Sequence, residues 1–414
     1  MRRAKHRLPG IVISEHEFSV PLDHGRAEGD RITVFAREVV AEGRERDGLP
    51  WLVFLQGGPG HEAPRPDELQ PVWLPRALEE FRVLLLDQRG TGLSTPVDAE
   101  ALASGTPQEQ AEYLTHFRAD SIVRDAELIR RDLAAGERWS ILGQSYGGFC
   151  ALTYLSLAPQ GLRAALFTGG LAPLDRTADE VYRATYRRVL DRNRRFYERY
   201  PEGLGRVRAL ARELDAGDIR LPDGSRLTSR RLRAQGMVLG MTDGGERLHY
   251  LVERGLGYPF LRQLQEAETF EAAPIYAVLH EAIYCQGQAS RWSAQRVAAE
   301  FPELDEPTTF TGEMVYPWMF DDFAQLRPLR EAAHLLAEYE DWPRLYAPDV
   351  LRQNDVPCAA AIYADDLYVE RVFSEETAAT VRGLRAWVTD EYQHDALRKH
   401  GDVVLDRLLS MLAE

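Results

Sequence analysis

One serine lies among glycines where an apolar run ends. The stretch GQSYG (143–147) fits the pattern G-x-S-x-G, with the apolar run WSIL before it and the helix-like GGFCALTYLSLAP (147–159) after it. A serine on a sharp turn between a strand and a helix exposes its hydroxyl at the sheet edge, and the helix N-terminus favours a developing negative charge. We therefore predict Ser145 as a nucleophile. The alternative is a glycine-rich turn with an inert serine.

A serine nucleophile needs a base, which in this arrangement follows it along the chain. The histidines after Ser145 are His249, His280, His334, His394 and His400. The first three fall in a long helical segment, whereas His394 follows the strand-like run LRAWVTDEY (384–392) by a short loop. We predict His394 as the general base and keep His400 as the alternative. Either could instead be a solvated surface histidine.

An acid that orients the base should leave the preceding strand. The run CAAAIYADD (358–366) ends in two carboxylates, Asp365 and Asp366. We predict that Asp366 accepts a hydrogen bond from the histidine ring and that Asp365 caps the following turn.

An oxyanion hole needs two backbone N–H groups. One should be that of Tyr146, the residue after the nucleophile, and the other should come from a loop after an earlier strand. The loop LQGGPG (55–60) has this place in the chain. We predict Gly58 as the second donor, with Gly57 as the alternative. The competing interpretation is a plain Gly-Pro turn.

The elements that must position these residues alternate between strands and helices. Short, wholly apolar runs are typical of strands buried on both faces, and apolar residues at helical spacing indicate amphipathic helices. Strands are predicted at 15–24, 31–40, 50–58, 81–90, 139–145, 164–170, 356–366 and 384–392. Helices are predicted at 119–135, 147–159, 374–383 and 402–412. The order predicts an α/β fold with a mostly parallel sheet.

The segment from 175 to 345 differs from the rest, because it is helical, rich in Arg, Glu and Tyr, and without strong strand runs. We predict a helical cap inserted before the last strands of the sheet. The chain then divides into a first core part at 1–174, a cap at 175–345 and a second core part at 346–414.

Composition limits the partners and the compartment. The chain has 414 residues and a formal net charge of -15, which disfavours nucleic acids and anionic membranes as partners. Its three cysteines lie far apart, so neither a disulfide framework nor a zinc site is predicted. The basic N-terminus has only GIVI as an apolar stretch, too short for a signal peptide, and no run approaches the length of a membrane span. We therefore predict a cytoplasmic protein; its oligomeric state stays open.

Five motifs together resemble one family. QGGPG (56–60), LLLDQRGTGLST (84–95), GQSYGG (143–148), YADDLYV (363–369) and EYQHDAL (391–397) occur in the order found in prolyl aminopeptidases, also called proline iminopeptidases, which are α/β-hydrolases. The resemblance covers nearly the whole catalytic core. One departure is Gln56, where the family more often has histidine before GGPG.

The resemblance implies removal of an N-terminal proline from peptides, through a prolyl-enzyme ester and without a metal or cofactor. The family uses cap glutamates to bind the cationic imino group of the substrate. Glu281 in LHEAIYCQ (279–286) and Glu313 in FTGEMVYPWMF (310–320) are the two candidates here. We expect Tyr316 and Trp318 to wall the proline pocket. Structural ion pairs for the glutamates and ordinary packing for the aromatic residues are the alternatives.

Three other functions compete with this interpretation. An esterase or amidase could use the same Ser-His-Asp arrangement, because fold and triad do not fix the substrate, but it would not need buried acids near its entrance. An aminopeptidase that accepts residues besides proline is a close variant. A non-catalytic binding protein on the same fold would be expected to have lost one of the three residues, and the sequence retains candidates for all three.

Overall fold

A computed structural model describes residues 2–26, 28–67, 71–268, 270 and 273–413. In this part of the chain one sheet has the strand order β1-β2-β3-β5-β4-β6-β7-β8-β9. The strands are β1 (Arg2–Leu8), β2 (Ile11–Pro21), β3 (Arg31–Ala41), β4 (Trp51–Leu55), β5 (Arg82–Asp87), β6 (Trp139–Gln144), β7 (Leu162–Thr168), β8 (Cys358–Tyr363) and β9 (Leu384–Thr389). Every strand predicted from the sequence overlaps one of these.

The sheet is antiparallel at its N-terminal edge and parallel elsewhere. Strands β1, β2, β3 and β5 pair antiparallel in turn, and all pairs from β5 through β4 and β6 to β9 are parallel. The prediction of a mostly parallel α/β sheet is confirmed. Strand β1 was missed, because its sequence RRAKHRL is polar and basic. Such charged side chains are typical of edge strands, where they discourage pairing with other chains.

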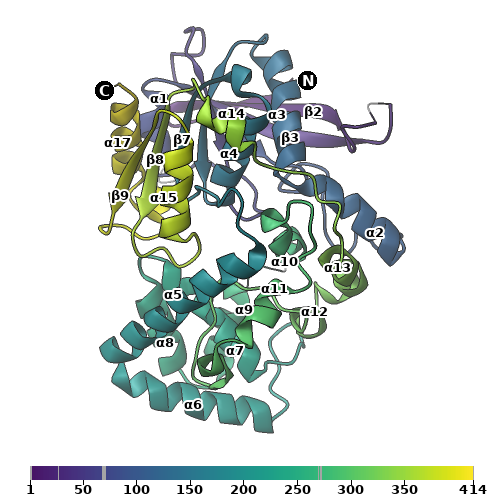
Figure 1. Cartoon of the computed structure of the whole chain (residues 1–414), viewed down its shortest axis with the longest axis vertical. Coiled ribbons are helices and arrows are strands. Elements are labelled where there is room, and N and C mark those ends of the chain that lie inside the picture. Colours follow the sequence, from purple (N-terminus) through teal and green to yellow (C-terminus); the bar gives the residue numbers. More distant parts are fainter. Residues whose placement is uncertain (1, 27, 68–70, 269, 271–272, 414) are drawn as a thin grey trace.

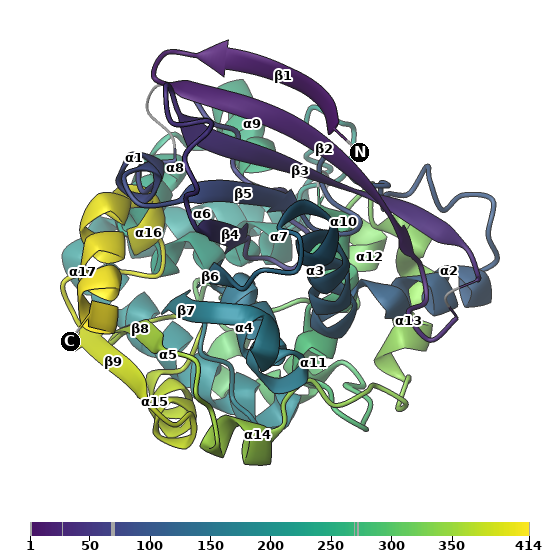
Figure 2. The same cartoon turned by 90° about the horizontal axis from the view of Figure 1, so that it is seen from above.

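Helices cover both faces of the sheet (Figures 1 and 2). The helices of the core are α1 (Leu74–Leu78), α2 (Pro107–Leu114), α3 (Ala119–Leu133), α4 (Tyr146–Leu157), α14 (Pro348–Arg352), α15 (Arg371–Thr380), α16 (Ala396–Lys399) and α17 (Gly401–Ala413). Alternate residues of β4 join different apolar clusters: Leu52 and Phe54 pack with α1 and α17, whereas Val53 and Leu55 pack with α3 and α4. This burial on both faces explains the continuous apolar runs of the central strands.

A large helical region lies between β7 and β8, and we call it the cap. Its helices are α5 (Ala178–Arg199), α6 (Pro201–Ala216), α7 (Ser229–Ala234), α8 (Gly244–Glu253), α9 (Tyr258–Ala267), α10 (Pro274–Leu279), α11 (Ser293–Ala298), α12 (Met319–Asp322) and α13 (Arg330–Ala337). Two 3-10 turns of the cap also matter, η3 (Gln235–Gly240) and η5 (Glu281–Tyr284). In Figure 1 the cap forms a layer beside the carboxyl ends of the strands. The predicted cap is confirmed as a large helical region, and its exact boundaries stay a prediction.

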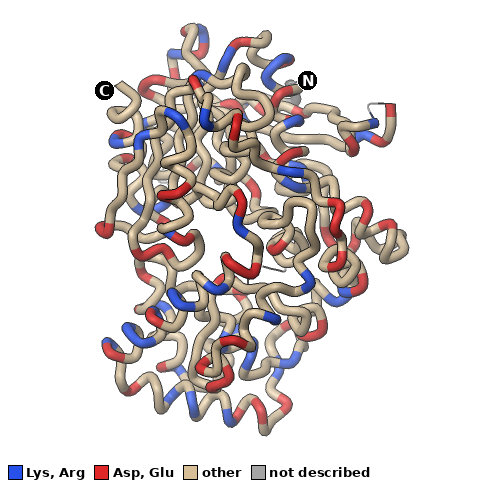
Figure 3. Tube along the Cα trace, in the orientation of Figure 1, with Lys and Arg blue, Asp and Glu red and all other residues tan. Residues whose placement is uncertain are grey.

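Charged residues of both signs are interspersed along core and cap (Figure 3). Among the helices in the described ranges, none has the length and apolar character needed to cross a membrane.

Candidate active site

Ser145 lies on a sharp turn between β6 and α4. Its backbone angles, φ 56° and ψ -125°, fall in a region that side chains other than glycine rarely adopt. A Cβ atom at Gly143 would overlap the carbonyl of Gly147, and one at Gly147 would overlap the carbonyl oxygen of Leu55 at the end of β4. The flanking glycines are therefore required for the turn to fit between two strands. The geometry is that of a nucleophile elbow.

Asp366 and His394 form a buried pair. The Nδ1 atom of His394 lies 2.8 Å from Oδ2 of Asp366, and both side chains are almost wholly buried. The other carboxylate oxygen of Asp366 accepts hydrogen bonds from the backbone N–H groups of Tyr368 (2.8 Å) and Val369 (3.1 Å). These bonds fix the carboxylate, which in turn can fix the tautomer and the orientation of the imidazole ring.

The prediction that the side chain of Asp365 caps the following turn is wrong. The side chain that bonds the N–H groups of this turn is that of Asp366. The carboxylate of Asp365 points to the cap and accepts a hydrogen bond of 2.7 Å from Arg195 of α5. The two neighbouring aspartates have different partners because the loop turns one toward the histidine and the other toward the cap.

The electrostatic surroundings of His394 favour its protonated form. Burial alone would lower the pKa of His394, but the charge and hydrogen bond of Asp366 and the charge of Glu313 outweigh it and raise this pKa above the ordinary value. Arg398 acts in the opposite direction. The ring of Tyr368 packs edge-on against the imidazole, with centroids 4.6 Å apart. His394 is thus held on two sides and has a raised affinity for a proton.

A Gly-Gly turn after β7 lies against both Ser145 and His394. A Cβ atom at Gly169 would lie 3.1 Å from Nδ1 of His394, and one at Gly170 would overlap the carbonyl oxygen of Ser145. The alternative base, His400, is exposed and packs at a tilt against Tyr392, with ring centroids 5.2 Å apart. The fold therefore brings His394 to the Ser145 turn.

The loop after β4 lies directly beside Ser145. A Cβ atom at Gly57 would approach the Cβ atom of Ser145 to 2.9 Å. Gly58 has φ +132°, and its peptide bond to Pro59 is cis. Tyr146 opens α4, where the first backbone N–H groups have no partner within the helix. The loop and the helix start thus meet at Ser145, and both Gly57 and Gly58 remain candidates for the second oxyanion donor.

Glu313 lies in the cap and faces this site. Its side chain is 16% exposed; one oxygen accepts a 2.5 Å hydrogen bond from the hydroxyl of Tyr276, and the other lies 3.7 Å from Nε2 of His280. Burial alone would raise the pKa of Glu313, but the interactions with His280 and Tyr276 and the charge of His394 lower it below the ordinary value. Glu313 is therefore an ionised carboxylate in a largely apolar place.

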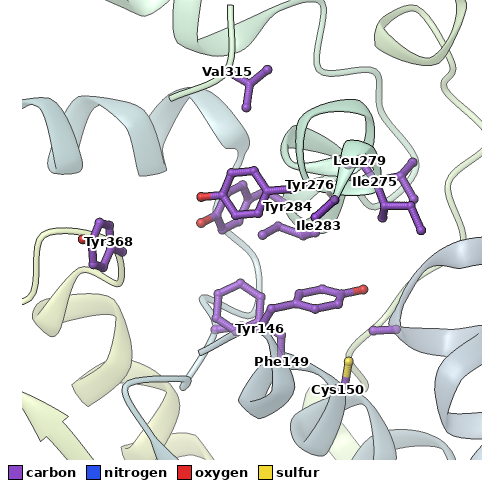
Figure 4. Packing of buried hydrophobic residues seen from close by; sticks show 14 of the residues in the cluster. Tyr146, Phe149, Cys150, Ile275, Tyr276, Leu279, Ile283, Tyr284, Val315 and Tyr368 are labelled. Atoms are coloured by element: carbon purple, nitrogen blue, oxygen red, sulfur yellow. The ribbon is translucent and has the colours of Figure 1, made fainter. Parts of the chain in front are cut away.

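A cavity of about 200 Å³ adjoins Glu313 in the cap. Its walls are mostly apolar and include Met237, Phe270, Tyr276, Met314 and Phe323, and Arg398 also lines it. Figure 4 shows the rings of Tyr276 and Tyr284 of the cap near Tyr146 and Phe149 of α4, with Tyr368 across from them. The cavity combines a mostly apolar lining with the carboxylates of Glu268 and Glu313 and the guanidinium groups of Arg247 and Arg398.

Glu281 has different contacts from Glu313. It is buried, and its two carboxylate oxygens accept hydrogen bonds from the backbone N–H groups of Ser293 (3.0 Å) and Ala294 (2.8 Å) at the start of α11. Burial raises the pKa of Glu281 against the effect of these bonds. The structure thus gives Glu281 an acceptor role at a helix N-terminus.

Tyr316 and Trp318 are not among the described residues that line the cavity. The Tyr316 hydroxyl lies 2.9 Å from the hydroxyl of Tyr186 in α5, and burial raises its pKa to about 12. Trp318 stacks on Tyr316 and on Phe323, below the guanidinium of Arg230. Both rings contribute to the internal packing of the cap, and their role as walls of a proline pocket stays a prediction. The segment bends at Glu313 and turns again at Pro317 and Trp318, and neither feature was visible in the sequence.

Sequence reasoning missed three residues near Glu313. Tyr276 and His280 are one helical turn apart, immediately before Glu281. This i, i+4 spacing was the sequence signal that could have identified them as neighbours in one site. His61 follows the GGPG motif and packs against Tyr276, with ring centroids 5.6 Å apart. Burial and the charge of Arg398 lower the pKa of His61 to about 4, against the effect of Glu313, so this imidazole is neutral.

Two other chemistries have little support in the described residues. Cys150, one turn into α4, is wholly buried, and burial raises the pKa of its thiol, which keeps it from acting as a thiolate nucleophile. In the described ranges no group of three or more His, Cys, Asp or Glu side chains is arranged to hold a metal ion.

Comparison with known proteins shows which family the chain belongs to. The family model of the alpha/beta hydrolase fold matches residues 50–253. A proline iminopeptidase of Aeromonas sobria is 52% identical over 98% of this chain and 97% of its own length, and one of Aspergillus aculeatus is 34% identical over 99% and 96%. A solved proline iminopeptidase of Mycobacterium smegmatis aligns with a TM-score of 0.47 and 14% identity, covering 96% of this chain and 97% of that chain. On the two sequence matches to proline iminopeptidases, each over nearly the full length of both chains, the chain belongs to the proline iminopeptidase family of α/β-hydrolases.

Proposed function

We propose that this protein is a serine exopeptidase that releases N-terminal proline from peptides. The observation that carries the proposal is Glu313, an ionised cap carboxylate close enough to His394 to raise its pKa. A hydrolase that acts on any acyl group has no need of a negative charge there. An exopeptidase must recognise the free, cationic imino group next to the bond it cleaves, and a carboxylate of low exposure does so at short range.

The proposed reaction has two halves, which share one proton carrier. The Nε2 atom of His394 takes the proton of the Ser145 hydroxyl as its oxygen bonds to the prolyl carbonyl carbon. The resulting oxyanion accepts hydrogen bonds from the N–H groups of Tyr146 and of Gly58 or Gly57. His394 then gives the proton to the leaving amine, and the C–N bond breaks to leave a prolyl ester on Ser145. A water molecule then gives a proton to His394 as its oxygen bonds to the ester carbon; the ester C–O bond breaks, His394 returns the proton to the Ser145 oxygen, and proline leaves.

Within this proposal Glu313 anchors the imino group, and the adjoining cavity takes apolar parts of the bound peptide. Tyr276 and His280 hold the Glu313 carboxylate in place, since each lies against a different oxygen. Glu281 remains the second candidate for the anchor. Its oxygens already accept backbone N–H groups, so we assign it mainly to the start of α11.

The test is a panel of aminoacyl-naphthylamides, each free and N-acetylated, on the purified protein. We expect cleavage of free prolyl-naphthylamide, weaker cleavage of other residues, and none of the acetylated form, because acetylation removes the cation. Equal turnover of the two prolyl forms would favour the esterase or amidase interpretation. Comparable rates for alanyl and prolyl substrates would favour a broader aminopeptidase.

A second measurement separates an enzyme from a binding protein. A fluorophosphonate probe should label the folded parent and fail to label Ser145→Ala. Absence of labelling in both proteins would count for a non-catalytic hydrolase fold. A cytoplasmic location is a further part of the proposal, and cell fractionation would test it.

A further inference from the structure

The residues on either side of His394 are both bonded to the cap. The side-chain oxygen of Gln393 accepts a 2.9 Å hydrogen bond from Nη2 of Arg192 in α5. A carboxylate oxygen of Asp395 accepts two hydrogen bonds from Thr242, one from its backbone N–H (2.9 Å) and one from its hydroxyl (2.6 Å). Thr242 lies between η3 and α8. The loop that carries His394 is therefore attached to the cap at two points.

Arg192 also bonds the loop that carries the acid. The same Nη2 atom donates to the backbone carbonyl of Asp365 at 2.7 Å. One guanidinium nitrogen thus joins the residue before Asp366 to the residue before His394. Two positions that are 28 residues apart in the chain, and that form the acid–base pair, are linked through a third element.

Further bonds attach the same region to the cap. The hydroxyl of Tyr368, whose ring packs against His394, donates a 2.5 Å hydrogen bond to the carbonyl of Met237 in η3. Arg188 of α5 makes a two-pronged ion pair with Glu370, at 2.9 and 2.8 Å. Arg188 and Arg192 are one helical turn apart, so one face of α5 meets the acid loop.

We propose that Arg192 and Thr242 are positioning residues for His394, so that the cap and not the core alone sets the geometry of the base. The proposal rests on the proposed function of His394. The loop follows β9, which is the last strand at one edge of the sheet and has neighbours on one side only. The cap bonds supply the restraint that a second neighbouring strand would otherwise give. Because the cap also carries Glu313, both substrate binding and the position of His394 depend on the cap.

The test uses Arg192→Met and Thr242→Val, which remove the side-chain donors and keep similar volumes. Arg194→Met is the matched control, because Arg194 lies on the same helix but bonds Asp191 and Glu198 at the surface. Thr242→Ser is the rescue variant, since it restores the hydroxyl. For each protein we would measure kcat and KM for prolyl-naphthylamide, the rate of Ser145 labelling by a small fluorophosphonate, and the melting temperature.

We expect Arg192→Met to lower both kcat and the labelling rate by about tenfold or more, because small misplacements of a catalytic group cost up to about a hundredfold in rate. KM should change little. Thr242→Val should show a smaller loss, which Thr242→Ser restores, and Arg194→Met should match the parent. The small fluorophosphonate does not need the carboxylate that binds the imino group. Its labelling rate therefore depends only on the reactivity of Ser145 and on the position of its base.

Parent-like kcat and labelling in folded Arg192→Met and Thr242→Val would overturn the proposal. A rise in KM with unchanged kcat and labelling would also overturn it, because the two residues would then act on substrate binding. If Arg192→Met does not fold, the Thr242 pair decides. Failure of the proposed function is distinct, since the parent itself would then lack selective cleavage of free prolyl-naphthylamide, whether or not the probe labels it.

Discussion

Replacement of Glu313 by glutamine removes one negative charge and little else. The amide has nearly the shape of the carboxylate, and its oxygen can still accept the hydrogen bond from Tyr276. The side chain is 16% exposed, so solvation by water compensates only in part for the loss of the negative charge. The variant therefore tests the electrostatic attraction between the cap and a cationic imino group, and it also removes a charge that raises the pKa of His394.

The size of the effect follows from Coulomb's law. Two unit charges about 4 Å apart interact with about 4 kcal/mol at an effective dielectric constant of about 20. A hydrogen bond to a charged group contributes about 1.5 to 3 kcal/mol, and part of this survives with a neutral acceptor. We expect a net loss of about 2 to 4 kcal/mol in transition-state binding, which is about a 30-fold to 1000-fold decrease in kcat/KM.

The assay compares kcat/KM for free and N-acetylated prolyl-naphthylamide in the parent, in Glu313→Gln and in Glu281→Gln. The ratio of the two substrates should fall strongly in Glu313→Gln and stay near the parent value in Glu281→Gln. The rate of Ser145 labelling should change much less than the ratio, because the probe carries no imino group. The melting temperature shows that each variant is folded.

Two results would refute this reasoning. If Glu313→Gln kept the parent kcat/KM toward the free substrate, Glu313 would not contact the imino group. If the Glu281 variant lost discrimination and the Glu313 variant kept it, the anchor would be Glu281, and the bonds to the start of α11 would not prevent that role.

Three further predictions concern the site. In Asp366→Asn, kcat should fall by up to about 10⁴-fold. The Asp366 charge raises the pKa of His394, and the base must be neutral, so the acid limb of the pH–kcat/KM profile should also move to lower pH. An unmoved limb would contradict the pairing of Asp366 with His394. Gly57→Ala places a Cβ atom 2.9 Å from that of Ser145, so kcat should fall about a hundredfold in a folded protein, and parent-like kcat would show that the loop adapts. Glu281→Gln leaves a backbone N–H group at the start of α11 without its acceptor, so chemical denaturation should show a loss of about 1 to 3 kcal/mol in unfolding free energy, and unchanged stability would argue against that assignment.

Local rules were sufficient for much of the core. The turn at Ser145 could be predicted because its glycine pattern spans only five residues, although Gly147 is required by contact with Leu55 of β4, and the structure has the expected strand, strained serine and helix. The strands at 50–58 and 81–90 were readable because burial on both faces makes every residue apolar. Edge strand β1 lacked this signal.

Pairings over long separations were not readable. The choice between Asp365 and Asp366 depended on the direction in which one loop turns, and the partner of Asp365 in this loop is Arg195 of the cap, 170 residues away. The link from Arg192 to Gln393 spans 201 residues. Nothing in the sequence near either residue marks the other as its partner.

The sequence by itself determined the type of fold and predicted the turn at Ser145 and the chain order of the candidate serine, acid and histidine, because steric limits and apolar patterning act over short stretches of chain. Only the tertiary structure decided which aspartate meets His394, that Glu313 and not Tyr316 or Trp318 borders the cavity, and that the cap holds the histidine loop. These outcomes depend on how the cap and the core pack. The energy of an interaction between charges or of a hydrogen bond depends on distance and burial and not on separation along the chain.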